Sequence, residues 1–170
     1  IGLTLKRISQ TTFSPKSFNN KYGVPLSLFN LKHNDEYGVF EVGMDKKGEI
    51  DNLTKIIKPD LGIITNISYA HSKNFKNINE IAKAKAEIMN NIKKGGIVLL
   101  NKDDNFFINH KNFALKKKLK VISFGIKSRF AMTKLIRIKK IKNKYELFIN
   151  VNGLFVSFYS HNKNKSNIYN

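Results

Sequence analysis

Cysteine is absent from the 170 residues of this chain. The chain can therefore form no disulfide and offers no thiolate as nucleophile or metal ligand, which is compatible with a cytoplasmic location. Long apolar runs are also absent. None approaches the ~20 residues that a membrane-spanning helix needs, and residues 1–7 lack the apolar segment of a secretory signal. We therefore expect a cytoplasmic protein with no membrane segment.

Acidic residues are scarce. Asp and Glu number 12 against 31 Lys and Arg, which gives a formal net charge of +19. A basic surface attracts phosphates, so a non-catalytic α/β module that binds nucleic acid is one alternative, and it predicts a contiguous positive face. The lysines, however, occur in nearly every segment together with abundant Asn and Ile. This spread favours a compositional bias over a binding patch, and we expect no nucleic-acid partner.

The length fits one folded domain, and a hydrophobic content of 41% argues against disorder. From about residue 37 to 125, strand-like and helix-like segments alternate, which is typical of an α/β fold with a parallel sheet flanked by helices. Expected strands cover 37–44, 61–66, 96–100 and 121–124, and expected helices cover 48–57, 78–92 and 103–117.

After Gly125 the pattern changes to antiparallel strands. Asn152-Gly153 is a strong two-residue hairpin signal between residues 146–151 and 154–159. A strand near 132–141 would complete a small antiparallel sheet near the C-terminus. We expect a single domain in which residues 1–128 form the βαβ portion and residues 129–160 form this sheet.

The expected helix 78–92 carries a lysine where an apolar residue belongs. Its apolar residues fall at 78, 81, 82, 88, 89 and 92, and the missing middle position of this stripe is Lys85. Glu80, Lys83 and Glu87 lie off the stripe, so we expect Lys85 alone among the charged residues to face the core. A lysine there extends its amine to solvent, pairs with an acid, or is kept neutral for chemistry.

Two further polar residues follow the expected strands. Glu41 lies in the second half of the strand 37–44, and His71 lies in the loop after the strand 61–66. Ligands of parallel sheets bind beyond the carboxyl ends of the strands. We therefore expect Glu41, His71 and Lys85 to meet at one sheet edge.

Five spaced motifs occur in order along the chain. They are Asn19-Asn-Lys-Tyr-Gly-Val-Pro25, Phe40-Glu-Val-Gly-Met44 with Gly48-Glu-Ile50, Thr65-Asn-Ile67 with Ala70-His71, Ile81-Ala-Lys-Ala-Lys-Ala-Glu-Ile88 and Leu100-Asn-Lys-Asp-Asp104. Together they resemble the central ATPase domain of the Mur ligases. The first two look most like the branch that adds D-alanyl-D-alanine to UDP-N-acetylmuramoyl-tripeptide. Another Mur ligase or folylpolyglutamate synthase is the related alternative.

The resemblance implies an ATP-dependent amide-bond ligase of peptidoglycan synthesis with ATP and Mg²⁺ as cofactors. In this family the substrate carboxylate forms an acyl phosphate, which the incoming amine then attacks. The partners implied are UDP-N-acetylmuramoyl-tripeptide and D-alanyl-D-alanine. We expect a monomer.

The resemblance also implies roles for individual residues. Glu41 and His71 match magnesium ligands of the family, and Lys85 matches its carbamylated lysine, whose carbamate is an anionic oxygen ligand. Asn20 matches a region that approaches the UDP-sugar substrate and the metal. Near the end, Asn167 and Asn170 match the family's adenine-side motif, in which Ser166 replaces a histidine.

Some family features are missing from the chain. The family's phosphate-binding loop, Gly-x-x-Gly-Lys-Thr, is not present in this sequence. Two explanations are open: Ile1-Gly-Leu-Thr4 is a degenerate remnant of the loop, or the loop lies upstream of Ile1. The chain starts without Met, and we expect it to lack the UDP-binding and C-terminal domains of the family. We expect a truncated piece that is inactive alone. Ser72-Lys73 and Asp45 also depart from the family pattern beside the presumed metal site.

Overall fold

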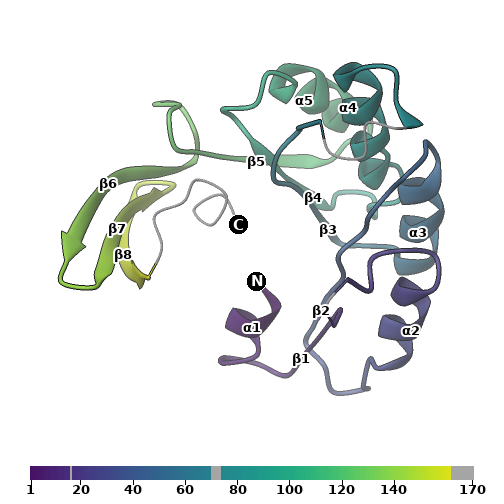
Figure 1. Ribbon diagram of the computed structural model, residues 1–170, viewed down its shortest axis with the longest axis horizontal. Coiled ribbons are helices and arrows are strands. Elements are labelled where there is room, and N and C mark those ends of the chain that lie inside the picture. The colour runs from purple at the N-terminus through teal and green to yellow at the C-terminus, as the bar shows by residue number, and fades with distance from the viewer. Residues whose placement is uncertain (16, 70–73, 162–170) are drawn as a thin grey trace. The chain divides into compact units, whose positions relative to one another are not determined.

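The computed structural model describes residues 1–15, 17–69 and 74–161. The chain divides into two compact units, one made of Ile1–Pro59 and Tyr69–Asn91 and the other of Asp60–Ser68 and Ile92–Asn170. Both units contain helices and strands, so the expected α/β class is confirmed (Figure 1).

The first unit combines one short parallel strand pair with several helices. Its elements are α1 (Gly2–Leu5), β1 (Thr11–Phe13), α2 (Gly23–Phe29), β2 (Tyr37–Val39), α3 (Glu49–Ile57), α4 (Ile78–Ala86) and the 3₁₀ helix η2 (Glu87–Asn90). Strand β1 pairs with β2, and α3 contacts α2, α4 and η2 (Figure 1). Buried apolar side chains come from each of these helices: Val24, Ile50, Leu53, Ile81 and Met89.

Helix α3 shows how the local sequence sets the boundaries of an element. Ile50, Leu53 and Thr54 are buried at a helical spacing, so one face of α3 packs inward. The helix ends where Lys58 takes a left-handed conformation with φ of 50°, and Pro59 follows, which cannot continue a helix.

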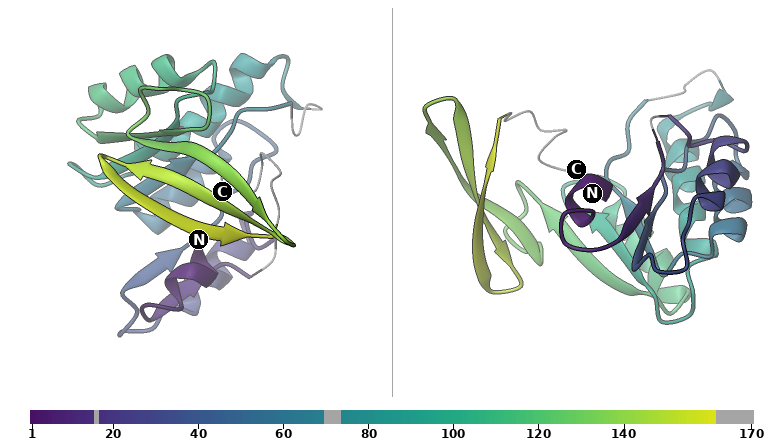
Figure 2. Two further views of the ribbon diagram at one scale, coloured as in Figure 1. Left: turned by 90° about the vertical axis from the view of Figure 1, so that its left-hand side faces the viewer. Right: turned by 90° about the horizontal axis from the view of Figure 1, so that it is seen from below.

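The second unit is built on one six-stranded sheet. Its elements are β3 (Leu61–Ile64), β4 (Ile97–Asn101), α5 (Phe107–Lys116), β5 (Lys120–Gly125), β6 (Thr133–Ile141), β7 (Lys144–Val151) and β8 (Leu154–Ser160), and the strands are paired in chain order. Strands β3 to β5 are parallel and contact α5 through β4 and β5. Strands β6 to β8 are antiparallel and form the twisted ribbon in Figure 2, as the hairpin signal predicts.

The antiparallel strands continue the parallel sheet. Phe124 and Gly125 of β5 pair in parallel with Thr133 and Lys134 of β6, which joins the two parts of the sheet. The expected antiparallel sheet is therefore confirmed as strands, and it is the outer half of a larger mixed sheet. The division of the chain at residues 128 and 129 stays a prediction.

The prediction of a strand over residues 37–44 is wrong in the length of the strand and in the strand with which it pairs. Strand β2 ends at Val39 and pairs with β1, whereas β3 belongs to the other sheet of the described residues. Beyond the strand, Gly43 donates its backbone N–H to the Asn19 carbonyl (2.6 Å). A side chain on Gly43 would lie 3.0 Å from Asn19 Cγ, so the Asn19 side chain would have to shift to make room for it.

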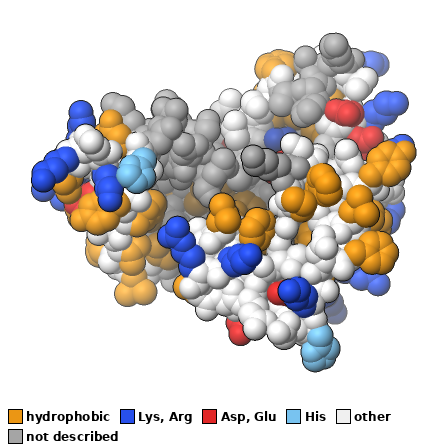
Figure 3. Space-filling model, turned by 60° about the horizontal axis from the view of Figure 1, so that its bottom comes forward, with side chains coloured by type: hydrophobic (Ala, Val, Ile, Leu, Met, Phe, Trp, Pro, Cys, Tyr) orange, Lys and Arg blue, Asp and Glu red, His pale blue; other side chains and the backbone are white. Residues whose placement is uncertain are grey.

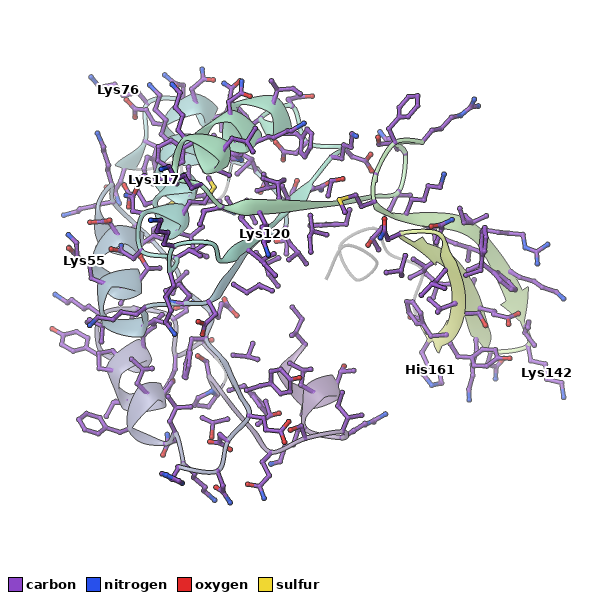
Figure 4. The ribbon with its side chains drawn as sticks, turned by 180° about the vertical axis from the view of Figure 1, so that it is seen from behind. Lys55, Lys76, Lys117, Lys120, Lys142 and His161 are labelled. Carbon is purple, nitrogen blue, oxygen red and sulfur yellow. The ribbon has the colours of Figure 1, made fainter. Side chains whose placement is uncertain are left out.

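The basic side chains are distributed over many elements. In Figure 3 the Lys and Arg side chains form small groups separated by hydrophobic and uncharged side chains. Lys55 at the end of α3 and Lys117 after α5 come from different units, while Lys142 and His161 lie at one end of the antiparallel strands (Figure 4). On the face that Figure 3 shows, this arrangement differs from the contiguous positive surface that a nucleic-acid-binding module would need.

Candidate functional site

Glu41 follows β2 by two residues and is exposed to solvent. Its Oε1 accepts a hydrogen bond from Asn19 Nδ2 (3.1 Å), and its backbone N–H donates to Ser14 Oγ (3.3 Å). The prediction that Glu41 lies within the strand is wrong, but the carboxylate does project beyond the carboxyl end of a parallel strand. Its exposed oxygens suit a hard cation such as Mg²⁺.

Asn19 was not among the residues predicted for the site. It contacts the Glu41 segment through both its side-chain amide and its backbone carbonyl, which accepts from Gly43. Its place in the motif Asn19-Asn20 was the available signal, but that motif alone did not indicate which asparagine contacts the acid.

Asn20, the predicted substrate-side residue, has a structural role in the first unit. Its Oδ1 accepts from the backbone N–H groups of Tyr22 and Gly23, both at 3.0 Å, where α2 begins. Asparagine commonly caps helices in this way. Asn20 is exposed, and its assignment to substrate stays a prediction.

The charged residues around Lys85 differ from the sequence prediction. Lys85 is half-buried, whereas Glu87, which was placed off the core-facing stripe, is 9% exposed. Helix α4 ends at Ala86 and the chain continues as the 3₁₀ helix η2, and the burial of Glu87 is possible because backbone N–H groups at the beginning of α3 bind its carboxylate. Lys85 is thus not the one charged residue of this segment that faces the interior.

The carboxylate of Glu87 binds the beginning of α3. It accepts from the Gly48 N–H (2.8 Å to Oε1 and 3.0 Å to Oε2) and from the Asp51 N–H (3.2 Å). The Glu49 carboxylate accepts hydrogen bonds from the backbone N–H groups of two residues that precede Gly48, Asp45 (2.6 Å) and Lys46 (3.0 Å). These bonds lower the pKa of Glu49, that from Asp45 most.

Residues at and just after the carboxyl end of β4 form hydrogen bonds with the loop after β3. Asn101 donates its side-chain amide to the Thr65 carbonyl (2.9 Å), and Asp104 accepts from the Ile67 N–H (2.9 Å). Both come from the motif Leu100-Asn-Lys-Asp-Asp104, and the loop that they hold leads toward residue 71. Asp104 therefore serves the loop as well as the turn before α5, and α5 begins at Phe107 and not at the expected residue 103.

Three predicted site residues lie outside the described residues. They are His71, Asn167 and Asn170, together with the neighbours Ser72, Lys73 and Ser166. Within residues 1–15, 17–69 and 74–161, no group of three or more His, Asp or Glu side chains could hold a metal ion. The convergence of Glu41, His71 and Lys85 stays a prediction.

The first residues of the chain do not form a phosphate-binding loop. Gly2–Leu5 is the helix α1, and a side chain on Gly2 would come within 2.5 Å of the Phe13 ring. Gly2 therefore allows close packing of a helix on a strand. The interpretation of Ile1-Gly-Leu-Thr4 as a remnant of the phosphate loop is not supported.

The donor types in the first unit fit the cation that the sequence implied. The Glu41 carboxylate is an oxygen ligand, and a carbamate on Lys85 would add another, which is the ligand chemistry of Mg²⁺. Lys85 itself is half-buried. Glu41 and Lys85 belong to the same compact unit.

Comparison with known protein families decides the family. The Mur ligase middle domain matches residues 1–170, the whole chain. The chain belongs to the Mur ligase family. The resemblance seen in the five motifs is thereby confirmed, and with it the α/β fold class of a Mur ligase central domain.

Individual relatives point to one branch of the Mur ligase family. The UDP-N-acetylmuramoyl-tripeptide–D-alanyl-D-alanine ligase of Rickettsia prowazekii is 36% identical over 143 residues, which cover 82% of this chain and 31% of that enzyme. A crystal structure of MurF from Acinetobacter baumannii matches 99% of this chain and 36% of its own, with 25% identity and a TM-score of 0.89. The chain thus spans about a third of these relatives.

A second solved structure shares the fold. MurF from Thermotoga maritima, in complex with ADP, matches 97% of this chain and 38% of its own, with 22% identity and a TM-score of 0.82. No helix within the described part of this Mur ligase chain is long and apolar enough to cross a membrane.

Proposed function

We propose that this chain is the ATP-binding part of a ligase that joins D-alanyl-D-alanine to UDP-N-acetylmuramoyl-tripeptide in peptidoglycan synthesis. The proposal is carried by the match to the Mur ligase middle domain along the whole chain, and relatives named for this reaction support the branch. The ADP in the Thermotoga maritima structure supports ATP as cofactor. The substrates remain part of the proposal because the chain spans 31% of the Rickettsia prowazekii enzyme.

Magnesium is the second proposed cofactor, held by Glu41, His71 and a carbamate on Lys85. To form the carbamate, the neutral Lys85 amine bonds to the carbon of CO2 and releases one proton, leaving an anionic oxygen ligand. Bound magnesium would offset the charge of the phosphates during phosphoryl transfer. A metal is also what makes an anion at this half-buried position favourable.

Other residues of the chain serve binding and orientation in this proposal. Asn19 holds one oxygen of Glu41 and so directs the carboxylate. Asn20 contacts the UDP-sugar substrate, and Asn167 and Asn170 contact the nucleotide. A monomeric state and a cytoplasmic location also stay predictions.

The reaction can be tested on the complete natural protein with purified substrates. We expect phosphate release from ATP only when the UDP-linked tripeptide and D-alanyl-D-alanine are both present, together with a product whose mass equals that of the two substrates joined with loss of water. Ligation of a single amino acid instead of the dipeptide would indicate another Mur ligase. Extension of a folate with glutamate would indicate folylpolyglutamate synthase, and either result would contradict the proposed branch.

A further inference from the structure

Glu87 is a buried acid to which the chemistry above gives no role. Its side chain is 9% exposed, and its two oxygens accept the three contacts from Gly48 and Asp51 described above. A buried carboxylate is costly unless hydrogen bonds satisfy it. These contacts explain how the first unit tolerates the charge.

The acid acts as a cap that comes from a distant part of the chain. The first N–H groups of a helix have no partner within the helix, and the positive end of the helix dipole favours an anion there. Gly48 occupies the capping position of α3 with a φ of 90° and has no side chain to cap with. Glu87, 39 residues later, supplies the carboxylate instead.

This cap connects the two segments that carry the proposed metal ligands. Glu87 follows Lys85 by two residues, and Gly48 ends the segment that begins at Glu41. Asn19 fixes the start of that segment through Glu41 and Gly43, and Glu87 fixes its end. The contact between Glu87 and Gly48 therefore links the segment of Glu41 to that of Lys85.

We propose that Glu87 is a positioning residue that sets the spacing between the Glu41 carboxylate and the Lys85 side chain. The proposal rests on the proposed function, because it takes both residues as ligands of one metal site. Glu87 itself contacts neither the metal nor the substrate. Its effect is carried by the backbone of residues 41–48.

The test is a titration of the complete natural protein with Mn²⁺ alone, followed by electron paramagnetic resonance. Mn²⁺ prefers the same oxygen ligands as Mg²⁺ and is detected directly when free. Glu87→Gln keeps the shape of the side chain but removes its charge and one acceptor oxygen. We expect this change to weaken Mn²⁺ binding about 10-fold, the lower end of the effect seen for residues that orient metal ligands.

Asn91→Ala is the matched control. Asn91 follows η2 directly and donates to the Asp51 carbonyl (3.1 Å) and to Thr54 Oγ1 (2.9 Å), so it joins the same two elements without contacting Gly48. We expect this variant to lower the Tm and to leave Mn²⁺ binding within about twofold of the unmodified protein. Equal losses of binding in Asn91→Ala and Glu87→Gln would show general destabilisation and overturn the positioning role.

A third variant separates this proposal from the proposed function. Glu41→Gln is expected to abolish Mn²⁺ binding. If Glu41→Gln abolishes binding but Glu87→Gln binds like the unmodified protein, the positioning role of Glu87 alone is overturned. If Glu41→Gln binds Mn²⁺ normally, or the unmodified protein shows no saturable binding, the proposed metal site is overturned and the role of Glu87 with it.

Discussion

Asn19 illustrates how single residues organise the proposed site. An exposed carboxylate on a loop samples several rotamers, and binding a metal restricts it to one of them at a cost in conformational entropy. The hydrogen bond from Asn19 Nδ2 to Glu41 Oε1 removes part of this freedom in advance. The same residue anchors Gly43 through its carbonyl, so backbone and side chain of the Glu41 segment are held by one asparagine.

The contribution of Asn19 can be measured by replacing it. We predict that Asn19→Ala raises the Mg²⁺ concentration for half-maximal ATP-dependent phosphate release about 10-fold, because Glu41 loses the group that orients it. The backbone bond to Gly43 remains, so the loss of folding stability should be about 1 kcal/mol. A titration of phosphate release against Mg²⁺ checks the first value.

Asn30→Ala is the control for this prediction. Asn30 donates its side-chain amide to the Leu26 carbonyl at the end of α2 and is exposed. We expect its replacement to leave the Mg²⁺ requirement unchanged. An unchanged requirement in Asn19→Ala as well would contradict the orienting role of Asn19.

The sequence was more informative about which residues are unusual than about their contacts. It singled out Glu41 and Lys85 because an acid in the second half of an apolar strand and a lysine on an apolar stripe are both unexpected. It missed Asn19 and Glu87, since their importance comes from partners 22 and 39 residues away. A helical stripe also assumes regular α geometry, and the change to a 3₁₀ helix at Glu87 breaks that assumption.

At the scale of elements, two carboxylates bind backbone N–H groups at the beginning of helix α3. Glu87 binds Gly48 and Asp51, and Glu49 binds Asp45 and Lys46. Together they fix the short segment between Glu41 and the helix. The geometry of this segment therefore depends on these two carboxylates.

Glu49 gives this arrangement a dependence on pH. The N–H groups of Asp45 and Lys46 hold the pKa of Glu49 below its ordinary value of 4.5. As the pH falls, the unfolded chain takes up the proton first, so the stabilisation is complete above that value and is lost as the pH falls through the folded-state pKa. Glu49→Gln should therefore lower the Tm near neutral pH by about 2 °C or more. Below the folded-state pKa, the effect should be smaller.

Thermal unfolding followed by circular dichroism at several pH values checks this prediction. Glu36→Gln, an exposed glutamate just before β2, is the control and should show no such change with pH. A Tm difference between Glu49→Gln and the unmodified protein that stays constant from neutral to acidic pH would contradict the assigned role of the carboxylate.

Element types were largely predictable, whereas some boundaries were not. The periodic apolar residues of α3 and the Asn152-Gly153 turn gave α3, β7 and β8 with small errors. The start of α5 was placed too early, because Asp103 and Asp104 were taken to cap the helix that follows them in sequence, without regard to partners elsewhere in the chain. In the structure, Asp103 accepts from the N–H groups of residues 126–128, and Asp104 also reaches Ile67.

At the scale of the whole molecule, strand pairing was the least predictable feature. Alternating strands and helices indicate a parallel sheet, but they do not state which strands are neighbours. The prediction took β2 and β3 as parts of one sheet, and the structure pairs β2 with β1 and β3 with β4. The spaced motifs were the stronger signal, because they identified a family whose middle domain matches the entire chain.

The central claim is that Lys85 supplies a metal ligand for ATP-dependent ligation, and Lys85→Ala in the complete natural protein tests it most directly. We predict that substrate-dependent phosphate release falls about 100-fold or more, because a ligand of the metal that would offset the phosphate charge is lost. Short-chain carboxylic acids added to the assay should restore part of the activity by placing an oxygen ligand in the vacated space. A Lys85→Ala protein that is fully active without added acid would contradict the claim.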